Sequence, residues 1–383
     1  METLTAVLNP VEVQLDGSES LTQLVRPTRR AVPYQAPAHL EWLVNWATDR
    51  DNDDAVKVAV VHGAGGTGKT RLCVELGVAL TEGSWVTGFV PRGIQGSVDE
   101  AVFAALERSS GDTLVVVDYA DGRNTDDLLR LLAAARSHSG EGRLRVVLSS
   151  RQDLGWWDRL EALMGESGMT IETTVLDELR SQSQLGGRVA SAALRRFAVT
   201  SRDLMVTDNW VMLDLVLAAA LLSVDPGTEV PASRAALYRE VLNHEYKSWD
   251  TKSLNEMSEA DWQIAAAAIT LVAPETRRDA RAVVAAARVE AFLQGRPVPT
   301  SAVVDSFAAR WGDGDLHSYP EGLALRPDRV GDHLVRTITS TDTKLVRALL
   351  DWIGELGATQ IDKATELAER LLTNASRAVP TLM

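Results

Sequence analysis

The sequence is poor in cysteine and has no long uninterrupted apolar run. Cys73 is the one cysteine in 383 residues, which excludes an intramolecular disulfide framework and favours a reducing, cytoplasmic setting. The longest apolar stretch, residues 211–222, is short and contains Asp214, and the acidic start Met1-Glu2 lacks the basic residues of a secretory signal. We therefore expect a protein of the cytoplasm that does not enter a membrane.

An excess of basic residues is also missing. The chain has 53 acidic and 39 basic residues, a formal net charge of −14, whereas proteins that bind nucleic acid need a basic face. The composition therefore argues against direct nucleic-acid binding. One local basic cluster, Arg26, Arg29 and Arg30, is interpreted as a solvated linker rather than a binding patch. The length predicts about two to four domains.

One motif dense in glycine dominates what is present. It reads Gly63-Ala64-Gly65-Gly66-Thr67-Gly68-Lys69-Thr70 and matches G-x-x-x-x-G-K-[ST], the phosphate loop or Walker A motif. Residues without a Cβ let backbone N–H groups approach a phosphate chain closely. Lys69 is expected to reach the β- and γ-phosphates, and the Thr70 hydroxyl is expected to bind Mg²⁺. A β-rich run before the loop and helical spacing behind it support the prediction that a nucleoside triphosphate binds here with Mg²⁺.

The second half of such a site needs a carboxylate at the end of a neighbouring strand. Asp118 follows the apolar run Leu114–Val117 and is the expected Mg²⁺-holding acid, or Walker B aspartate; the alternative is a strand-end capping residue. Asp121 is a candidate for orienting the attacking water, or else a solvated turn residue. Arg151 follows the next apolar strand and is a candidate sensor of the γ-phosphate, or else an exposed loop arginine.

Strand and helix patterns alternate from residue 56 onward, which predicts an α/β core with a five-stranded parallel sheet. The predicted strands are 56–61, 85–90, 113–118, 143–149 and 171–176, with helices at 68–82, 98–109, 125–138 and 155–165. Residues 1–30 suggest a loosely packed lead-in, and a helix is expected at about 38–48. Beyond residue 184 the patterns are helical, at 186–198, 208–224, 232–248, 259–273, 276–293, 300–311 and 328–339.

A segment with Pro320 and Gly322, residues 316–325, suggests a β-hairpin, and with three helices it would outline a winged helix. Two last helices, 343–356 and 360–376, suggest a helix hairpin that starts a repeat array. The predicted organisation is a lead-in with its helix (1–54), a P-loop NTPase core (55–183), a helical domain (184–255), a winged-helix-like domain (256–341) and a C-terminal helix pair (342–383).

These features together resemble the STAND class of signal-transduction ATPases, and most of all its NACHT-like actinobacterial branch, whose members are often followed by tetratricopeptide repeats. The resemblance rests on the phosphate loop, the Asp118-x-x-Asp121 pair and Ser149-Ser150-Arg151. Further matching phrases are Ala31-Val32-Pro33-Tyr34, Gly155-Trp156-Trp157, Leu242-Asn243-His244-Glu245 and Arg326-Pro327-Asp328-Arg329. The resemblance covers about residues 30–340.

The resemblance implies a nucleotide-operated switch in bacterial signalling or antiviral defence. ADP would hold a closed state, exchange for ATP would open the chain and promote homo-oligomerisation, and hydrolysis would be slow; the trigger is not indicated. The sequence departs from the family pattern in three segments. Ala36-Pro37 replaces a Gly-Arg pair near the adenine, Gly122 stands where NACHT relatives carry an extra acid, and Trp210 replaces a proline near the ribose.

Two other functions remain open from the sequence. A turnover ATPase of the AAA+-like kind would need an efficient general base and an arginine from a neighbouring subunit, and Gly122 counts against it. An adaptor that holds a nucleotide inertly is compatible with the altered adenine segment.

Overall fold

The computed structural model divides the chain into two compact units, and each is described here by itself. Unit 1 comprises residues 1–16 and 25–234, and unit 2 comprises residues 17–24 and 235–383. The residues that the structure describes are 8–10, 20–49, 55–91, 100–151, 155–164, 170–175, 183–199, 204, 210–248, 257–274, 276–287, 300–311, 323–326 and 328–341. Within these ranges no helix combines the length and the apolar character needed to cross a bilayer.

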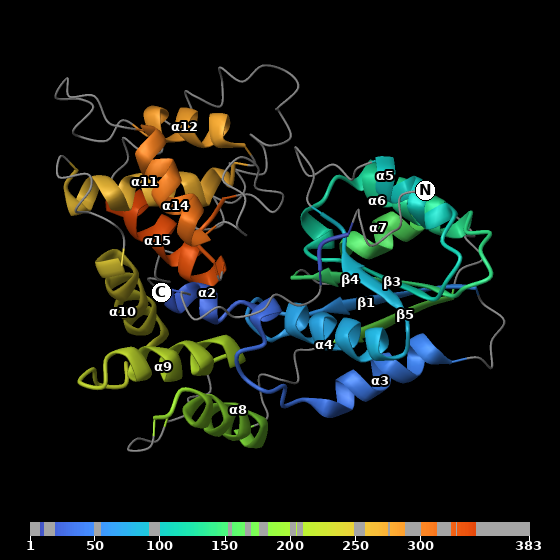
Figure 1. Cartoon of the computed structure of the whole chain (residues 1–383), viewed down its shortest axis with the longest axis horizontal. Helices are drawn as coiled ribbons and strands as arrows, with labels where there is room; N and C mark the ends of the chain where they lie inside the picture. The colour runs from blue at the N-terminus through green and yellow to red at the C-terminus, as the bar shows by residue number, and fades with distance from the viewer. Residues whose placement is uncertain are drawn as a thin grey trace, which may run out of the picture. The chain divides into compact units, whose positions relative to one another are not determined.

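Unit 1 is built on a sheet whose strands are parallel and lie in the order β2-β3-β4-β1-β5. Figure 1 labels β1, β3, β4 and β5 of this sheet. The strands are β1 (Val56–His62), β2 (Val86–Phe89), β3 (Thr113–Val117), β4 (Leu144–Ser150) and β5 (Thr170–Val175). Continuous apolar runs form the central strands because both faces of a parallel sheet are covered by helices. The predicted parallel α/β sheet is confirmed.

Helices cover both faces of this sheet. α3 (Pro37–Thr48) and α4 (Lys69–Glu82) lie on one face, and α5 (Glu100–Glu107), α6 (Thr125–Arg136) and α7 (Gly155–Met164) lie on the other (Figure 1). Alternate strand residues, such as Val58 and Val60, join Leu106, Leu131 and Leu132 in one buried cluster. This helical cover leaves the carboxyl edge of the sheet to the loops that carry the candidate site.

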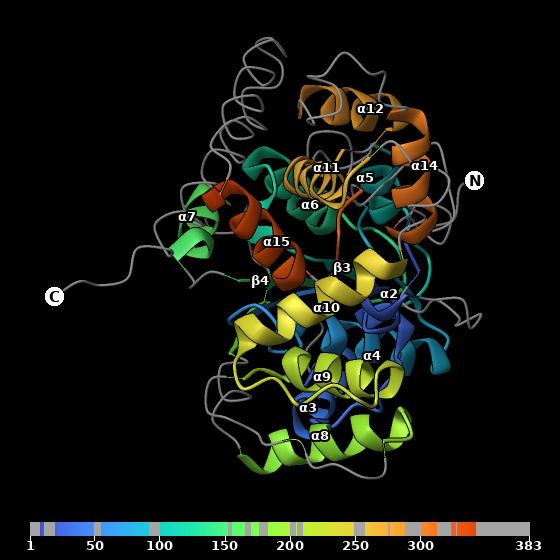
Figure 2. The same ribbon diagram turned by 90° about the vertical axis from the view of Figure 1, so that its left-hand side faces the viewer.

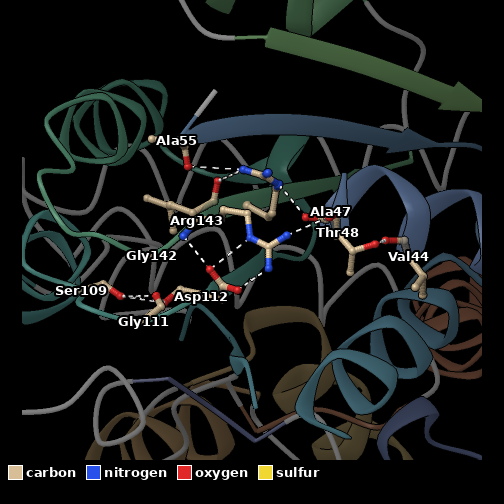
Figure 3. Close-up of polar contacts among 12 residues, drawn as sticks. Val44, Ala47, Thr48, Ala55, Ser109, Gly111, Asp112, Gly142 and Arg143 are labelled. Atoms are coloured by element: carbon tan, nitrogen blue, oxygen red, sulfur yellow. Dashed lines mark hydrogen bonds and ion pairs between the residues drawn. The ribbon is translucent and has the colours of Figure 1, made fainter. Parts of the chain in front are cut away.

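Two arginines at the start of β4 hold the end of α3 against the opposite edge of the sheet. Arg143 is ion-paired with Asp112 and donates from Nη1 to the Thr48 carbonyl at 2.8 Å (Figure 3). Its guanidinium also lies 4.8 Å from the centre of the Trp85 ring. Arg145 is buried and donates from Nε to the Ala47 carbonyl at 3.0 Å. The positive groups meet the carbonyl end of a helix, where the helix dipole favours cations.

Part of the predicted lead-in is packed, so the expectation of a loose segment is wrong for its described residues. Asn9 pairs with Phe89 of β2 through two backbone hydrogen bonds of 2.8 and 2.9 Å, and Leu8 is buried. A Cβ on Gly88 would lie 2.5 Å from the Leu8 Cβ, so glycine is needed for this approach. The contact joins residues 80 positions apart in the sequence, and the turn-forming residues of the lead-in give no sign of such a contact.

After β5, the elements among the described residues are helices. Unit 1 adds α8 (Ser183–Arg196) and α9 (Met212–Val224), which lie side by side (Figure 2). α10 (Arg234–Ser248) begins at the boundary. Unit 2 also contains α2 (Leu21–Leu24), α11 (Glu259–Val272), α12 (Arg277–Ala286), α14 (Thr300–Trp311) and α15 (Asp328–Thr341). In that unit the Trp262 and Phe307 rings pack edge to face, with their centroids 5.4 Å apart.

Two predicted elements fall on residues that the structure does not describe. Most of the β-hairpin at 316–325 lies outside the described residues, and so does the helix pair at 343–356 and 360–376. The three helices predicted before the hairpin correspond to α11, α12 and α14, and α15 follows it, but most of the hairpin itself lies outside the described residues.

Candidate functional site

The glycine-rich loop follows β1 directly and leads into α4, as the motif requires. Gly66 has φ 78° and Gly68 has φ 104°, values in the left-handed region that favours glycine. Thr67 closes the loop on itself, since its hydroxyl donates to the Ala64 carbonyl at 2.8 Å. α4 begins at Lys69, so the positive end of its dipole lies at the loop.

Lys69 is 6% exposed and lies against the loop that precedes it. Its Nζ donates to the Gly63 carbonyl at 2.5 Å and to the Ala64 carbonyl at 2.9 Å. Burial lowers the pKa of Lys69 to about 8, and the positive charge of Arg151 acts in the same direction; the Asp118 carboxylate opposes both. An anion brought to this amine would raise its pKa again, because an opposite charge nearby favours the protonated form.

Asp118 follows β3 and contacts the hydroxyl of Thr70 directly. Its Oδ2 accepts a hydrogen bond from Thr70 Oγ1 at 3.0 Å. Its Oδ1 accepts from the Ser149 hydroxyl and, at 3.2 Å, from the Tyr119 backbone N–H. The two residues predicted to share Mg²⁺ are therefore together, and a hydroxyl beside a carboxylate is an oxygen pair that suits this ion.

The sequence predicted that the strand before Asp118 neighbours the strand before the phosphate loop, and the strand order differs from this in one respect. β4 separates β3 from β1, so the strand that carries Asp118 is not the immediate neighbour of the strand before the loop. The Thr70 side chain, from the first turn of α4, closes that distance. β4 itself ends in Ser149 and Ser150, which places its polar end between the loop and Asp118.

Asp121 and Arg151, the remaining predicted site residues, are also in contact. Asp121 Oδ2 accepts a hydrogen bond from the Arg151 backbone N–H at 3.2 Å. The Arg151 guanidinium lies over the Tyr119 ring, 4.6 Å from its centre, and Nη2 donates to the Tyr119 hydroxyl at 3.3 Å. All predicted site residues thus meet at one edge of the sheet.

The sequence did not indicate the structural role of Arg123, which binds backbone carbonyls beside the candidate site. This buried side chain donates from Nη1 to the Pro91 carbonyl at 2.9 Å, from Nη2 to the Val90 carbonyl at 2.9 Å and from Nε to the Asp118 carbonyl at 3.3 Å. It thereby ties the ends of β2 and β3 together beside the candidate metal ligand. No spacing in the sequence indicates this, because the acceptors are backbone carbonyls.

The first turn of α9 contacts the phosphate loop. The Leu213 N–H donates to the Gly66 carbonyl at 3.4 Å. Asp214, which the sequence showed only as a charge in an apolar run, is fully buried and accepts from the Val211 N–H at 2.9 Å and from Arg234 Nε at 2.8 Å. These hydrogen bonds help to explain how a buried carboxylate is tolerated there.

Residues before α3 pack on the outer side of α4. Arg30 donates to Glu75 through Nε and Nη2, both at 3.0 Å, and Arg71 donates to Glu75 at 2.8 Å and to the Val32 carbonyl at 2.7 Å. The interpretation of the basic cluster as a solvated linker is therefore wrong for Arg30. Its partner lies 45 positions along the chain, where local composition gives no signal.

Comparisons with known proteins agree with the core. Residues 39–163 match the model of the family described as novel STAND NTPase 5, which confirms the predicted resemblance to STAND-class P-loop NTPases over this part of the chain. A search of curated proteins found no match.

Among solved structures, the chain is similar to a Walker-type ATPase of Pyrococcus abyssi, with 12% identity, a TM-score of 0.41 and coverage of 82% of this chain and 99% of that one. It is also similar to the Orc1 protein of Aeropyrum pernix in complex with DNA, with 15% identity, a TM-score of 0.36 and coverage of 83% and 95%. We draw no functional conclusion from likenesses this distant.

Proposed function

Starting from a STAND-class NTPase core over residues 39–163, we propose that this chain is a regulatory switch that binds ATP and ADP and hydrolyses ATP slowly. The observation that carries the proposal is the meeting of Lys69, the Thr70–Asp118 pair and Arg151 at the carboxyl edge of one sheet. The backbone N–H groups of residues 63–70 and the Lys69 amine would hold the phosphates.

Magnesium fits the oxygen pair of Thr70 and Asp118. The ion, when bound, neutralises charge that develops on the phosphates. The protein's own contribution is to fix the two ligands, and the hydrogen bonds from Ser149 and the Tyr119 backbone orient the Asp118 carboxylate for this purpose.

Arg151 is proposed to sense the third phosphate. A guanidinium makes charge-assisted hydrogen bonds with phosphate. The interaction energy between Arg151 and the bound nucleotide would therefore depend on whether the γ-phosphate is present. Asp121 is proposed to orient the attacking water as a weak general base. Gly122 follows it where relatives carry a further acid, and for this reason we expect slow turnover.

The wider proposal keeps the predicted organisation. Helices of 184–255, a winged-helix-like domain at 256–341 and a helix pair at 342–383 would follow the core of residues 55–183, as in the NACHT-like branch. ADP would favour a closed form and ATP an open, self-associating form, in cytoplasmic signalling or defence. The two nucleotides would shift the equilibrium only by their difference in affinity for the two forms.

The test compares molecular mass in solution with each nucleotide. Light scattering after size-exclusion chromatography should show a larger species with Mg·AMP-PNP than with Mg·ADP, and Arg151→Ala should reduce the difference. Arg130→Ala, an exposed arginine on α6, is the control. Steady-state turnover should stay below about 1 s⁻¹. Equal masses with both nucleotides would contradict the switch, and unstimulated turnover well above that rate would favour an AAA+-like ATPase.

A further inference from the structure

Tyr119 makes two separate interactions with the Arg151 side chain. The guanidinium carbon lies 4.6 Å from the centre of the tyrosine ring, within the range of a cation–π interaction. The Nη2 group also donates to the tyrosine hydroxyl at 3.3 Å. The ring and its hydroxyl together therefore restrain the position of the guanidinium.

The backbone of Tyr119 is itself fixed in an unusual conformation. Its φ and ψ are 55° and 44°, in the left-handed region that residues with a Cβ rarely occupy. Its N–H donates to Asp118 Oδ1 at 3.2 Å, and its carbonyl accepts from the Gly122 N–H at 3.0 Å. Conformations of this kind persist when the surroundings hold them, and they concentrate at functional sites.

Arg151 is restrained from the other side as well. Its backbone N–H donates to Asp121 Oδ2 at 3.2 Å. The backbone and the guanidinium of Arg151 are thus both anchored to the same short turn, residues 118–122, which follows β3. The charge of Arg151 reaches the phosphate loop, because it contributes to lowering the pKa of Lys69.

We propose that Tyr119 positions Arg151 for the third phosphate and so sets the preference of the site for a triphosphate over a diphosphate. A free arginine loses rotamer freedom when it binds, whereas a stacked guanidinium has lost part of that freedom already. The ring contacts a face of the guanidinium, and phosphate oxygens would accept from N–H groups at its edge. The inference rests on the proposed nucleotide function, since it assigns a partner to the proposed sensor.

The test uses two substitutions that separate the ring from the backbone conformation. Tyr119→Asn removes the ring while keeping a residue that tolerates the left-handed region. Tyr119→Phe keeps the ring and removes the hydroxyl. Calorimetry should measure the affinity of each variant for Mg·AMP-PNP and for Mg·ADP, and the ratio of the two is the readout.

Tyr119→Asn should lower the triphosphate-to-diphosphate affinity ratio by about fivefold, the scale of one partly buried cation–π interaction. Tyr119→Phe should change the ratio less than Tyr119→Asn, because the stack remains. Affinity for Mg·ADP should stay within about twofold of wild type. A ratio unchanged by Tyr119→Asn overturns the proposal, and so does an equal loss of both affinities, which a merely structural role would produce.

Arg151→Ala distinguishes failure of this inference from failure of the proposed function. If Arg151→Ala lowers the ratio, Tyr119→Asn should add little in the Arg151→Ala background, because it acts through the arginine. An undiminished effect of Tyr119→Asn in that background overturns the positioning role alone. If Arg151→Ala leaves the ratio unchanged, the sensor role in the proposed function is wrong, and the positioning role falls with it.

Discussion

At the scale of single residues, the phosphate loop depends on a backbone conformation that a side chain disfavours. Gly68 has φ 104°, and an added Cβ would meet nothing within 4 Å, so a substitution there is penalised by conformation alone. Gly187 also has open space around its Cβ position but lies inside α8. The two glycines form a matched pair that differs in φ.

We predict opposite effects of alanine at these two positions. Gly68→Ala should destabilise unit 1 by about 1–2 kcal/mol and weaken nucleotide binding, because the loop must leave its left-handed conformation. Gly187→Ala should stabilise by about 0.5–1 kcal/mol, as expected inside a helix. Denaturant unfolding measures both. A destabilisation of equal size at the two positions would show that the conformation of the loop is not the cause.

Asp118 provides the second prediction at this scale. Asp118→Asn keeps an oxygen that can accept hydrogen bonds but removes the charge that binds Mg²⁺. Removing Mg²⁺ with a chelator should weaken ADP binding to the wild type by about tenfold, the effect expected for the loss of one charged contact. The same treatment should change ADP binding to the variant little. Asp126→Asn, at an exposed aspartate in the first turn of α6, should behave as the wild type. Retained Mg²⁺ dependence in Asp118→Asn would contradict the assignment.

At the scale of elements, two arginines with similar partners differ in burial. Arg143 pairs with Asp112 and stacks on Trp85, and its side chain is 19% exposed. Arg130 pairs with Glu100 and lies over Phe103, but its side chain is 53% exposed. Because solvent weakens exposed ion pairs, only the first pair should hold elements together.

Arg143→Met should therefore destabilise unit 1 by about 2 kcal/mol, because Asp112 and the Thr48 carbonyl at the end of α3 lose the hydrogen bonds from the guanidinium. Arg130→Met should leave the thermal unfolding midpoint nearly unchanged. Differential scanning calorimetry of the two variants is the measurement. Equal midpoints would indicate that the Arg143 contacts are not needed to hold α3, and that Arg145 and the apolar contacts suffice.

In unit 2, a buried carboxyl group joins the short helix α2 to α10. Glu245 is fully buried, and its Oε1 accepts from the Thr22 N–H at 2.9 Å. Burial raises the pKa of Glu245 above its ordinary value of 4.5. The unfolded chain releases this proton near pH 4.5 but the folded chain keeps it to higher pH, so this group's contribution to stability falls as pH rises through that interval.

Glu245→Gln removes the ionisation and keeps an oxygen for the Thr22 N–H. The variant should unfold at a higher temperature than the wild type at pH 8, and the difference should shrink as the pH is lowered toward 4.5. Thermal unfolding followed by circular dichroism across this range is the measurement. A difference that does not vary with pH would mean that the carboxyl group does not titrate as described.

At the scale of the whole molecule, features that depend on neighbouring residues in the sequence were predictable, whereas contacts between residues far apart in the sequence were not. Valine-rich runs and the glycine loop are local signals, and they located the strands and residues 63–70 in their correct places. The contact of Ser149 with Asp118, the three carbonyls bound by Arg123 and the pairing of Asn9 with Phe89 depend on elements that meet only in the folded chain. The periodicity of a sequence does not predict contacts between residues far apart in it.

The central claim, that residues 63–70 hold a nucleotide, is tested most directly by titrating Mg·ADP into the wild type and into Lys69→Ala by calorimetry. Lys247→Ala, at an exposed lysine on α10, is the control, and circular dichroism must show that each variant is folded. We predict binding to the wild type and to Lys247→Ala, and no measurable binding to Lys69→Ala. A folded Lys69→Ala variant that binds Mg·ADP with wild-type affinity would contradict the account.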